Sequence, residues 1–341
     1  MKVLGFGEIL LRLSAPGYTK LFQKDYLDAT FCGAEANVAV SLAVLGIESA
    51  FLTKLPDNVL GKAAENSLRY FGVDTGKIQY GEGRMGTYFL EKGASQRSSK
   101  IIYDRAYSAF ALMKRDELAW ERIFEGIGWF HWSGINPALS ENIINICLDA
   151  LKTAKNKNIV VSCDLNYRKN LWSEEKAQRI MCKLLPYVDI CIANEEDADK
   201  TLGIKNTLND MEAGRLDREG YREVAKKIYK RYGCKYVATT LRESYSASNN
   251  GWSALLYDCL NDELFQSKKY DIQLVDRVGG GDSFAAGLIY GFLSKMNHQE
   301  IIEFATAASC LQQTIEGDYN RNTVCDIQNL LVKGGSGRVE R

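Results

Sequence analysis

The sequence is poor in the residues that build histidine-dependent or zinc-dependent sites. It contains two histidines, His131 and His298, in 341 residues. Its nine cysteines stand singly, without a CxxC pair, and their number is odd. A histidine-ligated metal centre, a Ser-His-Asp hydrolase and a disulfide framework are therefore not expected, whereas free thiols in a reducing cytoplasm are. His131, inside the aromatic segment GWFHWSG, is expected to be a packed strand residue.

An excess of charge of either sign is also absent, because Lys+Arg and Asp+Glu both count 43. This balance argues against a broad nucleic-acid surface and against electrostatic docking to membranes. No stretch approaches the ~18 uninterrupted apolar residues of a transmembrane helix. The opening MKVLGFGEILLRL is interrupted by Glu8 and Arg12, so it predicts a β-strand and not a signal peptide. A cytoplasmic protein is expected.

What the sequence does contain is an alternation of strand and helix patterns. Apolar runs such as IVVSC and ICIA are typical of strands covered on both faces, as in a parallel sheet. The segment SAFLTKL, 49–55, predicts a further strand, and the helical patterns over 34–46 and 58–72 each end at a glycine. The alternation predicts an α/β fold: a doubly wound, mostly parallel sheet flanked by helices.

Two segments, 10–31 and 86–106, break this rhythm. Each has the pattern of two strands joined by turn residues, without a crossover helix, so neither fits a parallel sheet. They predict a small projecting β-sheet that serves as a lid, with a decorative hairpin or an oligomer contact as the alternative. One α/β domain is expected over 1–333, and GGSGRVER at 334–341 is expected to be a flexible tail.

The segment DRVGGGDSFAAG, 276–287, places an acidic residue directly after three glycines. Glycine is costly to order, so three in succession need a reason. A helical pattern follows them, and main-chain N–H groups at a helix start form a cradle for anions. A carboxylate at Asp282 beside this cradle suits a general base facing an incoming hydroxyl, as in phosphoryl transfer.

A plainer interpretation of the same residues stays open, namely a glycine-rich helix start capped by Asp282. The chain has no GxxxxGK(S/T) loop, and no GxGxxG opens a helix after the first strand. The sequence therefore predicts neither a P-loop nor the dinucleotide-binding fingerprint.

DRVGGGD resembles the carboxyl-terminal signature D-T-x-G-A-G-D of the ribokinase-like (PfkB) sugar kinases. FCGAEANVAVSLAVLG is similar to the amino-terminal glycine pair and N-x-A helix of that family, and NEEDA at 194–198 is similar to its N-x-x-E segment. GEILLRL, IIYDRAYSA, DLNYRKNLW and EGDYNR resemble the 2-keto-3-deoxygluconate kinases within the family. The resemblance spans nearly the whole chain.

The resemblance implies an ATP- and Mg²⁺-dependent kinase that phosphorylates the 6-hydroxyl of 2-keto-3-deoxygluconate, with K⁺ as a further candidate ion. It implies a homodimer through the lid, or a higher homo-oligomer. Its implied general base is Asp282, and its implied anion hole is formed by Gly279, Gly280 and Gly281. The other implied residues bind the sugar (Gly33, Tyr88, Tyr103, Arg105, Arg168, Asp318), the nucleotide (Asn166, Arg168, Asn194, Thr240) or, through water, magnesium (Asn194, Asp197).

Some of these roles have a physical basis of their own. Tyr103 and Arg105 are two apart on a predicted strand, so their side chains share one face, where Arg105 suits a carboxylate. Arg168 directly follows a buried strand, where a cation suits phosphates or an acidic sugar. The plainer alternatives are a cross-strand pair for Tyr88, a turn residue for Asp318, a surface arginine for Arg168 and a capped acidic helix start for NEEDA.

The chain departs from the family pattern at several positions. Cys32 replaces the first glycine of the pair, Arg277 replaces threonine, Asp197 replaces glutamate, and the segment 240–251 lacks the usual glycines. A kinase for another sugar, such as fructose, ribose or 5-keto-gluconate, and a non-catalytic sugar-binding regulator on the same fold remain alternatives. Two arginines at the pocket favour the acidic sugar over a neutral one.

Overall fold

The computed structural model describes residues 1–194, 196–206 and 218–334, so the predicted tail lies outside the described residues beyond Gly334. Within this part of the chain, a nine-stranded sheet has the order β14-β13-β12-β11-β10-β9-β1-β4, and β15 also pairs with β13. The strands from β4 to β12 in this order are parallel, and β13 is antiparallel to β12, β14 and β15. Their bounds are β1 (Lys2–Phe6), β4 (Ser49–Leu52), β9 (Ile127–Ser133), β10 (Val160–Asp164), β11 (Ile190–Asn194), β12 (Tyr236–Ser244), β13 (Asn249–Asp258), β14 (Glu263–Gln266) and β15 (Tyr270–Gln273).

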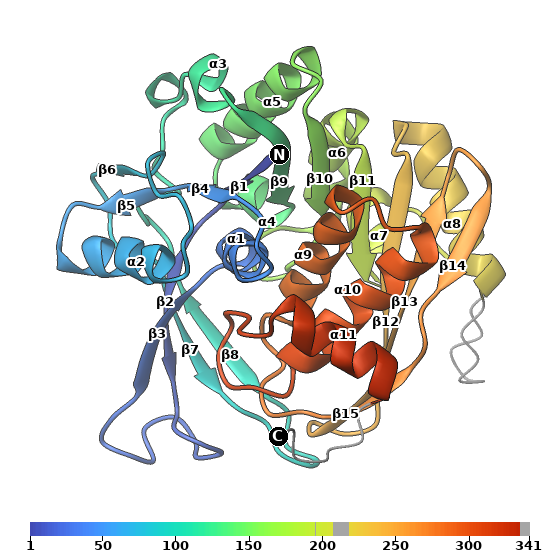
Figure 1. The fold of residues 1–341 in the computed structure, drawn as a ribbon. Coiled ribbons are helices and arrows are strands. Elements are labelled where there is room, and N and C mark those ends of the chain that lie inside the picture. The colour runs from blue at the N-terminus through green and yellow to red at the C-terminus, as the bar shows by residue number, and fades with distance from the viewer. Residues whose placement is uncertain (195, 207–217, 335–341) are drawn as a thin grey trace.

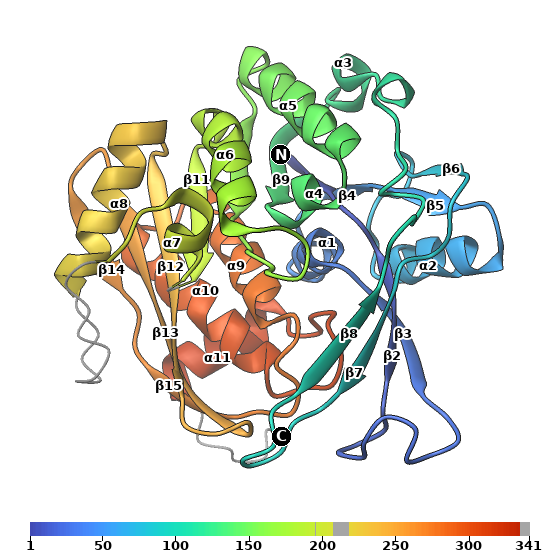
Figure 2. The ribbon, with the colours of Figure 1, turned by 180° about the vertical axis from the view of Figure 1, so that it is seen from behind.

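Helices cover both faces of this sheet, as the apolar runs predict (Figures 1 and 2). One face carries α1 (Ala34–Val44), α9 (Gly280–Leu293) and α10 (His298–Gln312), with α11 (Val324–Lys333) packed outside α10. The other carries α3 (Trp120–Ile123), α4 (Ile135–Leu139), α5 (Glu141–Asn156), α6 (Glu174–Leu184), α7 (Asp197–Leu202) and α8 (Arg218–Tyr232).

Strand β9 shows why both faces are apolar. Trp129 packs in the cluster on the α9 side, whereas Phe130 and Trp132 pack in the cluster on the α5 side. Successive side chains of a strand point to opposite faces, so a strand between two helical layers needs apolar residues at consecutive positions. His131 in the same strand is buried and contacts the Ser162 hydroxyl through Nδ1 at 2.9 Å, which confirms the prediction of a packed strand residue.

The segments 10–31 and 86–106 form the predicted separate sheet. Its order is β3 (Asp28–Cys32), β2 (Leu10–Ser14), β7 (Thr87–Glu91) and β8 (Lys100–Asp104). Two antiparallel hairpins, β2–β3 and β7–β8, join through a parallel pairing of β2 with β7. The sheet projects away from the helical layers (Figure 2), and we call it the lid.

The predicted strand 49–55 is interrupted. Its first part is β4 of the main sheet, and its last residues form β5 (Lys54–Pro56), which pairs with β6 (Gln79–Gly81) in a two-stranded sheet. The helix α2 (Val59–Tyr70) follows, capped by the Asn58 side chain. The local pattern specifies extended backbone but not the partner strand, which is why the interruption is not visible in the sequence.

Several other predictions are confirmed. The predicted helix ends at Gly46 and Gly72 have the left-handed φ values of 83° and 82° that favour glycine. The nine cysteines are free thiols. Across the described ranges, which omit 195, 207–217 and 335–341, none of the helices has the length and apolar character needed to cross a membrane.

Helix α9 depends on a close approach to α10 at Gly287. A Cβ atom at this position would lie 2.8 Å from the Ala305 Cα, so Gly287→Ala must displace α10. We expect a loss of about 1–3 kcal/mol in the free energy of unfolding, measured by urea denaturation. The matched control is Gly281→Ala in the same helix, where a Cβ meets no atom within 4 Å. Equal stabilities of the two variants would contradict the packing constraint.

Candidate functional site

A cavity of about 810 Å³ lies between the lid, the ends of several main-sheet strands and the start of α9. Asp164 and Asn194, the last residues of β10 and β11, contribute to its lining. This is the carboxyl edge of the parallel strands, where α/β sheets bind their ligands.

The cavity brings together all but one of the predicted site residues. Gly280 is the exception: it is buried, and a Cβ there would lie 3.0 Å from the Gln313 side chain. The predicted residues that line the cavity are Gly33, Tyr88, Tyr103, Arg105, Asn166, Arg168, Asn194, Asp197, Thr240, Gly279, Gly281, Asp282 and Asp318.

The glycine run forms the first turn of α9. Gly279 is the N-cap residue with φ 83°, and a Cβ there would lie 2.4 Å from the Asp318 carbonyl oxygen, so both backbone conformation and space require glycine. The first hydrogen bond of the helix runs from the Ser283 N–H to the Gly279 carbonyl at 2.9 Å. The preceding N–H groups of Gly280, Gly281 and Asp282 therefore have no acceptor within the helix.

Asp282 is the third residue of α9 and does not cap it, so the plainer interpretation of an aspartate cap does not hold. Its Oδ2 accepts a hydrogen bond of 2.6 Å from Asn37 Nδ2 in α1. Asn37 Oδ1 in turn accepts from the Gly33 N–H at 3.1 Å, so one side chain links the starts of both helices. Asn37 belongs to the N-x-A pattern but was not predicted as a site residue.

The electrostatic surroundings of Asp282 favour its protonated form. Burial raises its pKa to about 7, with the Asp318 and Glu35 carboxylates adding to the rise and Asn37 and Arg168 opposing it. A carboxyl group that titrates near neutrality is suited to act as a general base at physiological pH.

Tyr103 and Arg105 both face the cavity, as their spacing predicts, and the Arg105 Cζ lies 5.7 Å from the centre of the Tyr103 ring. Arg105 is also held by Glu8, whose Oε2 accepts from the Arg105 Nε at 2.8 Å and from Nη2. Glu8 follows β1 and was missed by sequence reasoning. Within the described residues its other oxygen, Oε1, is buried and has no hydrogen-bond partner.

Tyr88 and Asp318, which also line the cavity, form a buried cluster with Arg12 and Asp276. The Tyr88 hydroxyl donates to Asp318 Oδ2 at 3.1 Å, and its ring lies 5.8 Å from that of its cross-strand partner Tyr103. Asp318 is also paired with the Arg12 guanidinium, which bonds Asp276 as well. Tyr88 is therefore a cross-strand pair member and lines the cavity at once. Cys32 donates a weak hydrogen bond to the Tyr88 hydroxyl at 3.4 Å.

Asn194 and Asp197, from the acidic segment predicted at 194–198, accept backbone hydrogen bonds at the start of α7. Asn194 Oδ1 accepts from the N–H groups of Glu196 and Asp197 at 2.8 and 3.0 Å. The two Asp197 oxygens accept from the backbone amides of Tyr167, at 3.1 Å, and Asn194, at 3.0 Å. The same two side chains line the cavity, so the structural role and a role toward a ligand are compatible.

Asp164 is a further acid on this side of the cavity and was missed by the sequence reasoning. Burial raises its pKa well above the usual range, and the neighbouring carboxylates of Asp197 and Asp282 raise it further, whereas Arg168 opposes the rise. Its Oδ1 accepts from the Asn166 N–H at 3.0 Å. A carboxylate at the end of a parallel strand is the sequence signal that could have identified it.

The positive charge of Arg168 lowers the pKa values of both Asp164 and Asp282. Its Nη1 donates to the Tyr167 carbonyl at 3.0 Å. Thr240 stands opposite Asn194 in the β11–β12 register. The glycine-poor segment 240–251 forms part of the β12–β13 hairpin.

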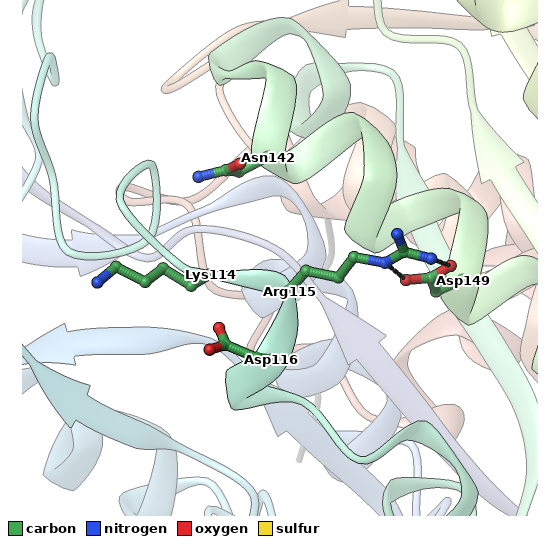
Figure 3. A pocket seen from close by; sticks show the side chains of 5 residues that line it. All are labelled: Lys114, Arg115, Asp116, Asn142 and Asp149. Atoms are coloured by element: carbon green, nitrogen blue, oxygen red, sulfur yellow. Dashed lines mark hydrogen bonds and ion pairs between the residues drawn. The ribbon is translucent and has the colours of Figure 1, made fainter.

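A second depression shares no residue with this cavity (Figure 3). It is lined by Lys114, Arg115, Asp116, Asn142 and Asp149, most of them exposed. Arg115 points toward Asp149 and bonds it through Nε and Nη2, so its charge is already compensated. Neither of the carboxylates that line it, Asp116 and Asp149, is fully buried, in contrast to several acids of the larger cavity.

The comparisons with known proteins agree with this architecture. The pfkB family carbohydrate kinase pattern matches residues 2–323. The structure is similar to that of a 2-dehydro-3-deoxygluconokinase from Thermotoga maritima, with a TM-score of 0.93 and 49% identity over 97% of this chain and 99% of that one. It is also similar to a PfkB family carbohydrate kinase from Listeria grayi, with a TM-score of 0.90 and 34% identity over 97% of this chain and all of that one.

In sequence, the chain is 30% identical to a 2-dehydro-3-deoxygalactonokinase from Haloferax volcanii, over 100% of its own length and 99% of the relative's. A 2-dehydro-3-deoxygluconokinase from Bacillus subtilis is 25% identical over 92% of this chain and 90% of the relative. Because the family pattern covers nearly its whole length, this chain belongs to the pfkB family of carbohydrate kinases.

Proposed function

We propose that the chain is an ATP-dependent kinase that phosphorylates the 6-hydroxyl of 2-keto-3-deoxygluconate, also called 2-dehydro-3-deoxygluconate. The observation that carries this proposal is the pairing at the start of α9. There a carboxyl group that titrates near neutrality shares the cavity with main-chain N–H groups that have no helical acceptor. The names of the relatives from Thermotoga maritima and Bacillus subtilis support the substrate.

In the proposed reaction, the Asp282 carboxylate accepts the proton of the 6-hydroxyl. The hydroxyl oxygen forms a bond to the γ-phosphorus of ATP while the bond from that phosphorus to the β–γ bridging oxygen breaks, and ADP leaves. The first-turn amides of α9 stabilise the charge on the transferring phosphoryl group. Asn37 keeps the Asp282 carboxylate oriented.

The cavity fits a magnesium ion held mainly by water and phosphate. The described residues contain no group of three or more His, Cys, Asp or Glu side chains placed to bind a metal. Asp164 and Asp197 nevertheless repel each other there, as the raised pKa of Asp164 indicates, and a nearby cation relieves this repulsion. Mg²⁺ commonly keeps several waters and uses one or two carboxylates with substrate phosphates. We propose that Asp197 and Asn194, together with Asp164, hold it through water, where it would neutralise phosphate charge.

The preference for an acidic sugar rests on the cations of the cavity. Both Arg105 and Arg168 line it, the first directly after the lid strand β8 and the second in the loop after β10. Arg105 bonds Glu8 through Nε and Nη2, which leaves its Nη1, together with the Arg168 guanidinium, to form charge-assisted hydrogen bonds with a ligand carboxylate. Gly33, Tyr88, Tyr103 and Asp318 complete the proposed sugar-binding side, and Asn166 and Thr240 complete the proposed nucleotide-binding side.

A dependence on K⁺ stays a prediction from the resemblance. Assays of turnover in potassium-free buffer check it.

We further propose that the α/β domain over 1–333 pairs with a second copy through its lid. The face of the lid turned away from the cavity carries apolar side chains that pair across neighbouring strands in the observed register. Ile102 on this face is 55% exposed. The side chains that share this face are Leu11, Leu13, Phe31, Phe89 and Ile102.

The pH dependence of turnover tests Asp282. Because protonated Asp282 accepts no proton, kcat/KM falls as the pH drops through about 7. Asn37→Ala removes a donor that lowers this pKa and moves the acid limb to higher pH. Asp282→Asn lowers kcat by about 10²- to 10⁴-fold. The control Asp326→Asn changes the aspartate at the same position of helix α11 and leaves kcat unchanged. Full turnover by Asp282→Asn would remove the assigned base.

The acid preference is tested by turnover of 2-keto-3-deoxygluconate against fructose. Arg105→Leu lowers kcat/KM for the acid by about 10- to 100-fold, the worth of a charged hydrogen bond, and changes the value for fructose far less. The double variant Glu8→Gln with Arg105→Leu avoids leaving a buried carboxylate unpaired and gives the same result. Arg84→Leu is the control, because Arg84 also lies beside the lid and pairs with an acid, Asp104. A parent enzyme that prefers fructose contradicts the acid preference.

Light scattering after size-exclusion chromatography tests the lid dimer. The parent elutes as a dimer, and Ile102→Glu yields a monomer because it buries a charge in the interface. Val332→Glu, at an 86% exposed position of α11, stays dimeric. A monomeric parent at micromolar concentration would exclude this dimer.

A further inference from the structure

Arg277 places a cation in the cavity, and none of the residues that the structure describes neutralises it through an ion pair. It lies between Asp276 and Val278, two residues before the N-cap glycine of α9, and its half-buried side chain lines the cavity. Within the described residues it forms no ion pair and donates no hydrogen bond. The other arginines considered above have partners: Arg12 two carboxylates, Arg105 the Glu8 carboxylate and Arg168 a backbone carbonyl.

The surroundings of Arg277 separate it from the acids of the cavity. Burial alone lowers its pKa, whereas a carboxylate nearby would raise it. No carboxylate contributes to this shift, which agrees with the absence of an ion pair to Arg277 among the described residues. A desolvated cation without a partner is costly unless an anion completes it when the ligand binds.

The position of Arg277 beside the glycine turn of α9 indicates which anion would bind it. Arg277 lies two residues before Gly279, and both line the cavity together with Gly281 and Asp282, whose N–H groups have no acceptor within the helix. An acidic sugar already has Arg105 on the lid, next to Tyr103. The remaining anion of the reaction is the phosphate chain of the nucleotide. The guanidinium fork is suited to two oxygens of one phosphate or of neighbouring phosphates.

We propose that Arg277 is a catalytic residue that contacts the β- and γ-phosphates of the nucleotide and stabilises the charge that moves to the β-phosphate as the γ-phosphoryl group transfers. This inference rests on the proposed kinase function and deepens it. The first-turn amides of α9 are fixed dipoles at the transferring group, and Arg277 adds a full positive charge beside them, as arginines do in other phosphoryl-transfer sites.

The test compares Arg277→Met, Arg277→Lys and the control Arg179→Met, which removes an exposed arginine outside the cavity. We expect Arg277→Met to lower kcat on the order of 10²-fold while the KM for the sugar stays within about twofold. Arg277→Lys recovers part of the loss because it restores the charge without the fork. Arg179→Met matches the parent.

Nucleotide binding provides a second readout. A variant that is misfolded, or that only binds the sugar poorly, would not show the same selective change in nucleotide affinity. In calorimetry, Arg277→Met weakens a non-hydrolysable ATP analogue by about tenfold or more and leaves AMP within about twofold. Equal weakening of both nucleotides, or a rise only in the KM of the acidic sugar, overturns the proposal. If the parent phosphorylates a different sugar, the proposed substrate fails but the same comparison is made with that sugar. If the parent turns over no sugar, the kinase function itself fails, and the analogue-to-AMP comparison still decides the phosphate contact.

Discussion

The buried pairing of Arg12 with Asp276 and Asp318 joins the parts of this protein that must work together. Arg12 is in lid strand β2, Asp276 opens the glycine turn, and Asp318 lies in the loop before α11. Asp276 also accepts hydrogen bonds from the N–H groups of Val278 and Gly317, both at 3.3 Å. Removing one member of such a buried pair typically costs about 3–5 kcal/mol, because the remaining charge stays without compensation. The lid is thereby fixed to the turn that begins α9.

This connection explains why the site has two different electrostatic sides. On the lid side of the site, Arg12 and Arg105 each pair with carboxylates of the protein itself. Much of their charge is therefore compensated before a ligand binds. At the start of α9, main-chain N–H groups and Arg277 lack such compensation among the described residues. An anion that enters the cavity therefore meets uncompensated positive charge at the α9 turn. A hydroxyl that approaches Asp282 from the lid side meets a carboxyl group close to its titration point.

Much of this arrangement is visible in the sequence. Three glycines before an aspartate predict a helix start with free amides, since only glycine permits the φ of 83° and the 2.4 Å approach at Gly279. The lid strands follow from short extended patterns without a crossover helix, and Arg105 faces the cavity as its spacing from Tyr103 predicts. What the sequence does not specify is pairing between distant segments. Glu8 is 97 positions from Arg105, and nothing local to either residue identifies the other. The segment 49–55 divides between two sheets for the same reason, because its last residues pair with the distant strand β6.

The most direct measurement is a crystal structure of this protein with 2-keto-3-deoxygluconate and a non-hydrolysable ATP analogue. We expect the 6-hydroxyl oxygen within hydrogen-bond reach of an Asp282 carboxylate oxygen, roughly 2.6–3.2 Å, with the γ-phosphate facing the N–H groups of Gly281 and Asp282. A complex in which the hydroxyl lies away from Asp282, or the phosphate lies away from the first turn of α9, would contradict phosphoryl transfer at this site.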